Sequence, residues 1–148
     1  MLFRILATTV STLLATLCFS TNALAEQSKM FGPFELHYSV VNTTFLEPDV
    51  AATYGITRGK KRAILNLAVR EHLEQGTAGR TMALKGRTWD LIHEESLEFM
   101  EVREGDAIYY IAEFTFINEE FRFFEMDFRP EGAKETYNFK FKHQLYIN

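Results

Sequence analysis

YNFKFKHQLYI, residues 137–147, alternates apolar and polar side chains without interruption. Successive side chains of a β-strand point to opposite faces, so this alternation predicts a strand with one face in a core and the other in solvent. The apolar face contains, in order, Tyr137, Phe139, Phe141, His143, Leu145 and Ile147. A histidine in such a row is more often a hydrogen-bonded core or rim residue than a metal ligand.

The same period of two recurs upstream and predicts an all-β chain. The alternating runs are residues 34–45, 62–71, 80–92 and 97–117. The last of them has the pattern of a hairpin that turns at Glu104-Gly105-Asp106, and Gly86 in the third predicts a bulge or a close backbone approach. About seven strands separated by turn signals favour an antiparallel, immunoglobulin-like β-sandwich. A small closed β-barrel is the alternative.

The aromatic residues change parity within residues 117–132. Phe121 and Phe123 occupy one parity, whereas Phe124 and Phe128 occupy the other. An extra residue inserted into a strand produces such a switch, so we expect a β-bulge near Phe123.

Four aromatic residues have the parity opposite to that of the most continuous apolar rows, and are therefore predicted on the other face of their strands. They are Tyr109, Phe121, Phe123 and Tyr146. Bulges and edge crossings can bury both parities of a strand, which favours a core position for these rings. If the second sheet leaves them uncovered, they form an exposed apolar patch of the kind that marks a binding surface.

FLEPDVAATYGITRGKKR, residues 45–62, is the least strand-like segment. Pro48 suits the first turn of a helix, and Gly55 suits its C-terminal end. We therefore expect a short helix between the first two predicted strands, with Val50, Ala51 and Tyr54 facing inward, that plugs one end of the sandwich.

A basic run follows the predicted helix and is the candidate binding site of the sequence. It consists of Arg58, Lys60, Lys61 and Arg62. Four cations at a loop tip can attract an anionic ligand or an envelope partner. The structural alternative is a solvated turn.

The chain contains no catalytic or metal-binding motif that we recognise. His37, His72, His93 and His143 have no spacing typical of a metal site, and neither a nucleophile elbow nor a phosphate loop is present. We therefore predict no catalytic residue, metal ligand or cofactor, and the sequence favours a non-enzymatic protein. The net charge of −4 argues against a nucleic-acid partner.

The N-terminal residues predict export. Arg4 precedes an apolar segment, and Ala23-Leu24-Ala25 fits a cleavage site, so residues 1–25 are predicted to be a signal peptide removed in the periplasm. Residues 26–33 then form a polar lead-in, and residues 34–148 form a single domain without a transmembrane span. The only cysteine, Cys18, lies in the signal peptide, so no disulfide is expected.

Nearly the whole predicted mature chain, and most specifically its first third, resembles a family of small exported proteins of Gram-negative proteobacteria that is classed as a domain of unknown function. The matching positions are His37-Tyr38, Asn42-Thr43-Thr44-Phe45-Leu46, Ala51, Tyr54-Gly55-Ile56, Arg58, Arg62-Ala63 and Asn66-Leu67. The resemblance implies a periplasmic, β-rich domain and transfers no activity, cofactor or catalytic residue.

These observations favour a periplasmic binding or accessory module for a protein or another envelope component. A small carrier that holds an apolar or anionic ligand in a sandwich or barrel cavity is the alternative. The sequence leaves the oligomeric state open.

Overall fold

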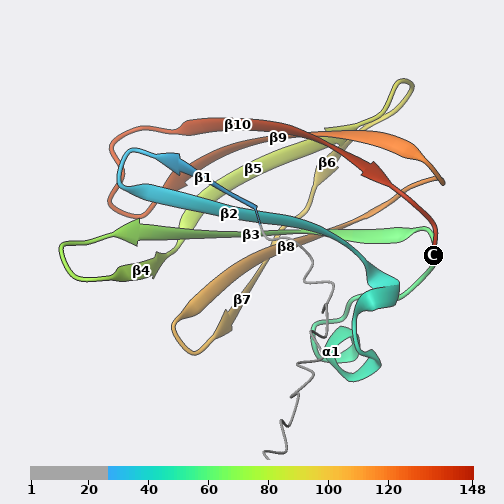
Figure 1. Ribbon diagram of the computed structural model, residues 1–148, viewed down its shortest axis with the longest axis horizontal. Helices are drawn as coiled ribbons and strands as arrows, with labels where there is room; N and C mark the ends of the chain where they lie inside the picture. The colour runs from blue at the N-terminus through green and yellow to red at the C-terminus, as the bar shows by residue number, and fades with distance from the viewer. Residues whose placement is uncertain (1–26) are drawn as a thin grey trace, which may run out of the picture.

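The computed structural model describes residues 27–148 and shows ten strands in two antiparallel sheets (Figure 1). The first sheet has the order β1 (Gln27–Phe31), β2 (Phe34–Asn42), β3 (Arg62–His72), β8 (Ala107–Thr115) and β7 (Met100–Glu104), with β4 (Thr77–Arg80) also paired to β3. The second has the order β10 (Tyr137–Leu145), β9 (Glu120–Pro130), β5 (Met82–Trp89) and β6 (Glu94–Leu97). The predicted sandwich is thus confirmed, and the sheets do not close into a barrel. The predicted signal peptide lies outside the described residues.

The structure contains three short strands that the alternation did not predict. β1 lies in the predicted polar lead-in and pairs with β2, while β4 and β6 have four residues each. Segments this short show too little alternation to be recognised. The predicted turn at Gly105 is confirmed between β7 and β8, but the first arm of that hairpin is divided, because Leu97 belongs to β6 of the other sheet.

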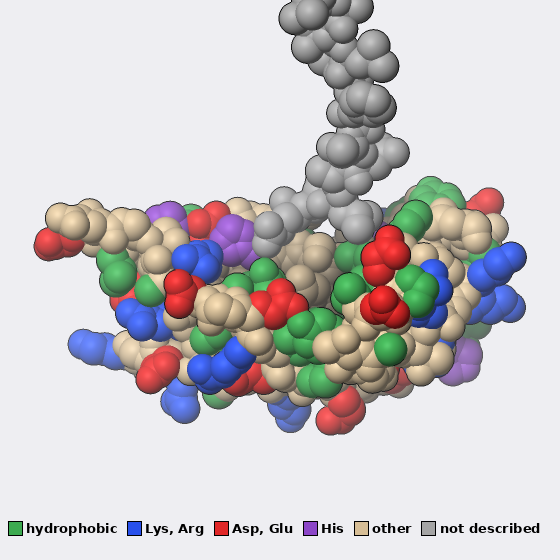
Figure 2. Space-filling view, turned by 90° about the horizontal axis from the view of Figure 1, so that it is seen from below, with side chains coloured by type: hydrophobic (Ala, Val, Ile, Leu, Met, Phe, Trp, Pro, Cys, Tyr) green, Lys and Arg blue, Asp and Glu red, His purple; other side chains and the backbone are tan. Residues whose placement is uncertain are grey.

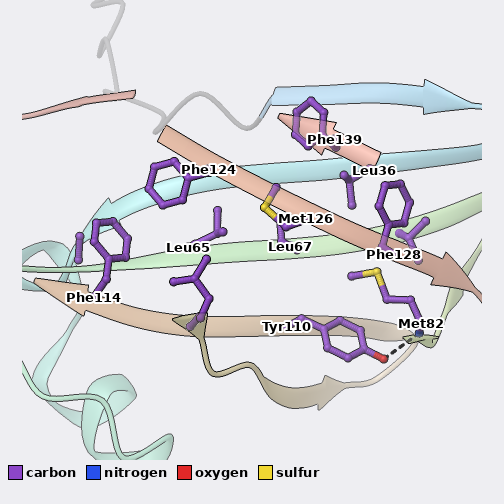
Figure 3. Packing of buried hydrophobic residues seen from close by; sticks show 14 of the residues in the cluster. Leu36, Leu65, Leu67, Met82, Tyr110, Phe114, Phe124, Met126, Phe128 and Phe139 are labelled. Carbon is purple, nitrogen blue, oxygen red and sulfur yellow. Dashed lines mark hydrogen bonds between the residues drawn. The ribbon is translucent and has the colours of Figure 1, made fainter. Parts of the chain in front are cut away.

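The core lies between the two sheets and is rich in aromatic rings (Figure 3). Phe124 stacks on Phe141 with 4.7 Å between ring centroids and meets Phe114 edge-on at 5.3 Å. Gly86 confirms the predicted close approach, because a Cβ atom at this position would lie 2.9 Å from the ring of Phe99.

The predicted bulge at Phe123 is wrong. β9 pairs with both β10 and β5 in an unbroken register from one end to the other. The inward row of β9 begins with Arg122 and continues through Phe124, Met126 and Phe128, all of which are buried. Phe121 and Phe123 lie on the opposite, outer face. The aromatic pattern changes parity only because a buried arginine, and not an apolar residue, occupies the first position of the inward row, so no inserted residue is needed.

A short helix connects β2 to β3, as the sequence predicts. α1 (Pro48–Thr53) follows the 3-10 turn η1 (Thr43–Phe45), and Gly55 has a φ of +67° just beyond the helix. The helix does not plug the space between the sheets. Ala51 and Ile56 pack with Val41 and Ile64, which point away from the main core, so this segment covers the outer face of the first sheet.

Val50 is exposed rather than inward-facing. Within residues 27–148, no helix is long and apolar enough to cross a membrane.

Candidate functional site

The functional candidates gather at one end of the sandwich. The strand register places the last residues of both β5 and β10 beside the first residues of β9. Arg122 Nη2 donates to the Thr115 carbonyl of the other sheet at 2.8 Å, which places the end of β8 there as well. Two features occupy this end, namely the tip of the β5–β6 hairpin and a cavity between β2 and β10.

The β5–β6 hairpin tip, residues 90–93, projects beyond the neighbouring strands (Figure 1). Asp90 Oδ1 accepts hydrogen bonds from the backbone N–H groups of Ile92 (2.6 Å) and His93 (2.7 Å). The Asp90 N–H donates to the His93 carbonyl at 3.0 Å, which closes the turn. These bonds fix the backbone of the tip, while Leu91 and Ile92 are 94% and 83% exposed.

Asp90 is connected to the core through Arg122, whose side chain is only 6% exposed. The guanidinium group of Arg122 contacts three carboxylates, with distances of 2.6 Å to Glu95 Oε1 and 3.4 Å to both Asp90 Oδ2 and Glu120 Oε1. Its Nε atom is buried without a hydrogen-bond partner among the described residues. The hairpin tip therefore rests on a buried ionic network.

The carboxylates of this network differ in pKa. Burial raises the pKa of Glu120 above its ordinary value, and a hydrogen bond with Asp90 adds to that effect. The backbone N–H groups of His93 and Ile92 lower the pKa of Asp90 to about 2, and a hydrogen bond from Glu120 adds to this effect. The anionic form of Asp90 is thus the form that the folded tip stabilises.

Replacing Asp90 with asparagine is expected to remove part of the acid sensitivity of the protein. Because the folded pKa of Asp90 lies below the unfolded value, its contribution is present above about pH 4 and is lost as the pH falls toward 2. Urea-unfolding midpoints measured between pH 5 and pH 2 should fall less steeply for Asp90→Asn than for the unchanged protein.

The asparagine side chain retains an acceptor for the turn, so the two proteins should fold alike. Glu125, whose pKa is also lowered to about 2, titrates in both proteins and cancels in the comparison. Equal acid slopes in the two proteins would contradict this role of Asp90.

The cavity between β2 and β10 has a volume of about 340 Å³ and opens where β1 begins. His143 lies in its lining and is half-buried, and burial lowers its pKa. His143 therefore lies at the rim of a cavity, which agrees with its predicted place as a core or rim residue of the apolar row.

The structure does not gather the predicted basic run into one site. Arg58 Nη2 donates to the Thr44 carbonyl at 3.1 Å, and Arg62 forms a 3.2 Å ion pair with Glu113. Both arginines thus hold the loop. Lys60 and Lys61 are exposed, and Lys61 lines the groove that contains Arg122. A binding role for the run stays a prediction.

Two of the remaining histidines share one carboxylate, and the third lies apart from them. His72 Nε2 lies 2.7 Å from Glu35 Oε2, and His37 Nε2 lies 3.7 Å from the same oxygen, on the outer face of the first sheet. His93 is exposed at the hairpin tip. Among residues 27–148, no group of three or more His, Cys, Asp or Glu side chains could hold a metal ion.

The expectation that the four opposite-parity rings are core residues is wrong. Phe121 and Tyr146 are 46% and 51% exposed, and Tyr109 and Phe123 are partly exposed. The sandwich has only two layers, so the outer face of each sheet meets solvent. Trp89 stacks on Phe123 with 5.6 Å between ring centroids, and the Lys142 ammonium group lies 4.1 Å from the centroid of the Phe121 ring. Together these side chains form an aromatic stripe on the outer face of the second sheet.

Sequence reasoning missed the hairpin tip because residues 80–92 read as one strand. The available signal was Asp90, a residue type whose side chain often binds backbone N–H groups two or three positions later in a turn. Charges of both signs are interspersed with hydrophobic side chains on the face in Figure 2, so charge alone does not identify a site there.

The fold defines a small two-sheet β-sandwich with a helical cover on one outer face. The chain belongs to the DUF4426 family, because the family model, described as a domain of unknown function, matches residues 28–148. This confirms the resemblance to a domain of unknown function. A search of the curated proteins found no match.

Solved structures agree with this assignment. The chain is similar to a DUF4426 family protein of Pseudomonas aeruginosa PAO1, with 30% identity, a TM-score of 0.71, and coverage of 83% of this chain and 96% of that chain. It is also similar to a copper-bound variant of FetP from uropathogenic Escherichia coli strain F11, with 11% identity, a TM-score of 0.58, and coverage of 84% and 97%.

A further FetP structure, of protein expressed in the periplasm of E. coli, matches with 11% identity, a TM-score of 0.57, and coverage of 84% and 95%. At this identity, the likeness to FetP shows the fold alone.

Proposed function

We propose that this protein is a non-enzymatic periplasmic binding module that docks onto an envelope protein through the β5–β6 hairpin tip. The observation that carries the proposal is the near-complete exposure of Leu91 and Ile92, at 94% and 83%, on a turn whose backbone is fixed. The predicted signal peptide supports the periplasmic location.

A fixed apolar tip is suited to binding because it loses little conformational entropy when a partner covers it. Two adjacent aliphatic side chains of this size can fill a complementary pocket and provide the buried centre of an interface. The ionic network beneath the tip supplies the rigidity, since Asp90 binds both the turn and Arg122.

The surroundings of the tip indicate the chemistry of the partner. Four carboxylates line the adjacent groove, against the two cations Lys61 and Arg122. These carboxylates are Asp90, Glu94, Glu95 and Glu120. Complementary charge favours a partner with an apolar pocket flanked by lysine or arginine. The aromatic stripe beside the tip extends the same apolar surface along the second sheet.

The alternative of an apolar-ligand carrier receives less support. Large rings in mutual contact fill the centre of the space between the sheets, where Phe124 and Phe128 are fully buried, and the cavity between β2 and β10 lies at the edge of that space (Figure 3). A carrier of this fold needs an interior space comparable in size to its ligand.

Site-specific crosslinking in living cells tests the proposed docking. A photo-crosslinking residue replaces Ile92 in one variant and Leu73 in a matched control, which is 47% exposed in the β3–β4 loop at the opposite end of the sandwich. We expect one defined protein adduct in the envelope from position 92 and none from position 73. Adding Leu91→Ser should reduce the adduct at least about fivefold, consistent with loss of one buried side chain.

An identical adduct pattern at both positions would show nonspecific contact and would contradict docking through the tip. The absence of any adduct from position 92 in correctly exported, folded protein would contradict it as well.

A further inference from the structure

The cavity between β2 and β10 lies beside the first described residue of β1, Gln27. β1 pairs with β2 only from Phe34 to Tyr38, although β2 continues to Asn42. Within the described part of the chain, no strand covers the outer edge of residues 39–42, and the cavity opens there toward the free edge of β10. Its volume of about 340 Å³ falls in the range of small-ligand sites.

Aromatic rings form both the floor and the rim of this cavity. Tyr38 and Phe141 lie at the floor with 4.8 Å between their centroids, and Phe139 and Phe124 hold these rings in place from behind. At the rim, Phe45 and Tyr146 are 57% and 51% exposed. These side chains offer partly buried flat surfaces inside and exposed ones at the mouth.

The polar side chains of the lining are mainly uncharged. Gln27 and Asn42 each carry both a donor and an acceptor of hydrogen bonds, whereas Gln144 Nε2 already donates to the Glu119 carbonyl at 3.3 Å. Asn42 Nδ2 donates to the Tyr146 carbonyl at 2.7 Å, which fixes the amide and leaves its oxygen available as an acceptor.

Charged side chains contribute little to the cavity. Among residues 27–148, its lining contains no aspartate or glutamate, and the ammonium group of Lys142 lies over the Phe121 ring on the outer face. Burial lowers the pKa of His143, so the imidazole is neutral near pH 7. An anionic ligand would find no buried cation among the described lining residues, and a hydrocarbon would leave the Asn42 amide oxygen without a partner.

We propose that the cavity between β2 and β10 is a binding site for a neutral saccharide. A sugar ring combines hydroxyl groups, which pair with amide donors and acceptors, with a flat face of C–H bonds, which an electron-rich aromatic face attracts. This combination matches the rings of Tyr38 and Phe141 together with the amides of Asn42 and Gln27, the residue that pairs with Tyr38. The site is independent of the hairpin tip.

An NMR titration of the isotopically labelled protein, produced from the full sequence, tests the proposal. The probes are tri-N-acetylchitotriose, maltotriose and trehalose, with indole and phenyl phosphate as apolar and anionic comparisons. We expect at least one saccharide to produce saturable shifts centred on the backbone amides of Asn42, His143 and Tyr146.

Tyr146→Ala should weaken that binding about tenfold, because it removes a rim ring but keeps the backbone carbonyl that binds Asn42. Leu73→Ala, at the opposite end, should leave the affinity unchanged. Three results would overturn the proposal, namely no saturable shift with any saccharide, shifts confined to another surface, or saturation of this cavity by indole or phenyl phosphate in preference to the sugars.

Discussion

Arg122→Met is expected to lower the free energy of unfolding by about 3 kcal/mol, which is typical of removing one partner from a buried ionic network. The methionine fills much of the same volume but leaves Glu120, whose side chain is 7% exposed, without its cation. It also removes the 2.8 Å hydrogen bond to the Thr115 carbonyl, which links the two sheets. Urea unfolding at pH 7 measures the change as a lower midpoint with an unchanged slope.

Arg87→Met is the matched control for this substitution. Arg87 also contacts two carboxylates, Glu94 and Glu125, but its side chain is 44% exposed. Solvent screens such pairs, so the expected loss is much smaller than that of Arg122→Met. Combining Arg122→Met with Glu120→Gln should restore part of the stability, because a neutral amide leaves no buried charge unpaired. Equal losses for the two arginines would contradict the buried network.

Phe124→Ala is expected to destabilise the protein by about 3–5 kcal/mol, the range found when a large buried aromatic side chain is removed from a core. Phe124 is fully buried and contacts rings from both sheets, with Phe141 stacked at 4.7 Å and Phe114 edge-on at 5.3 Å. Close packing prevents these neighbours from filling the space completely. Urea or thermal unfolding provides the measurement.

Phe121→Ala on the same strand is the control, since it makes the same chemical change on the opposite face. Phe121 is 46% exposed and contacts Lys142 on the outer surface. Its removal should cost about 1 kcal/mol or less. If Phe121→Ala destabilised the protein as much as Phe124→Ala, β9 would have to bury both parities, as the bulge prediction required.

The strands and the helix were predictable because their signals are local. Alternation in residues 34–42 and 137–145 is sufficient to place β2 and β10, and Pro48 with Gly55 is sufficient to locate α1. The direction in which α1 packs was not predictable. Ala51 and Ile56 pair with Val41 and Ile64, and only the pairing of β2 with β3 brings those two side chains together on an outer face.

The candidate sites were hidden for the same reason. The basic run is continuous in sequence, yet two of its four cations bind groups of the protein itself and hold the loop. The cavity between β2 and β10, in contrast, joins residues that are about 100 positions apart, such as Asn42 and Tyr146. Separation of this kind leaves no local pattern to recognise.

The sequence alone therefore determined the all-β class, the parity of β2 and β10 and the short capped helix, because each depends on residues within a few positions of one another. Tertiary structure alone decided that Arg122 occupies a core row and that Phe121 and Phe123 face solvent. The physical reason is that an inward arginine is stable only where carboxylates from other segments meet it, and Asp90 and Glu95 reach Arg122 from the β5–β6 hairpin.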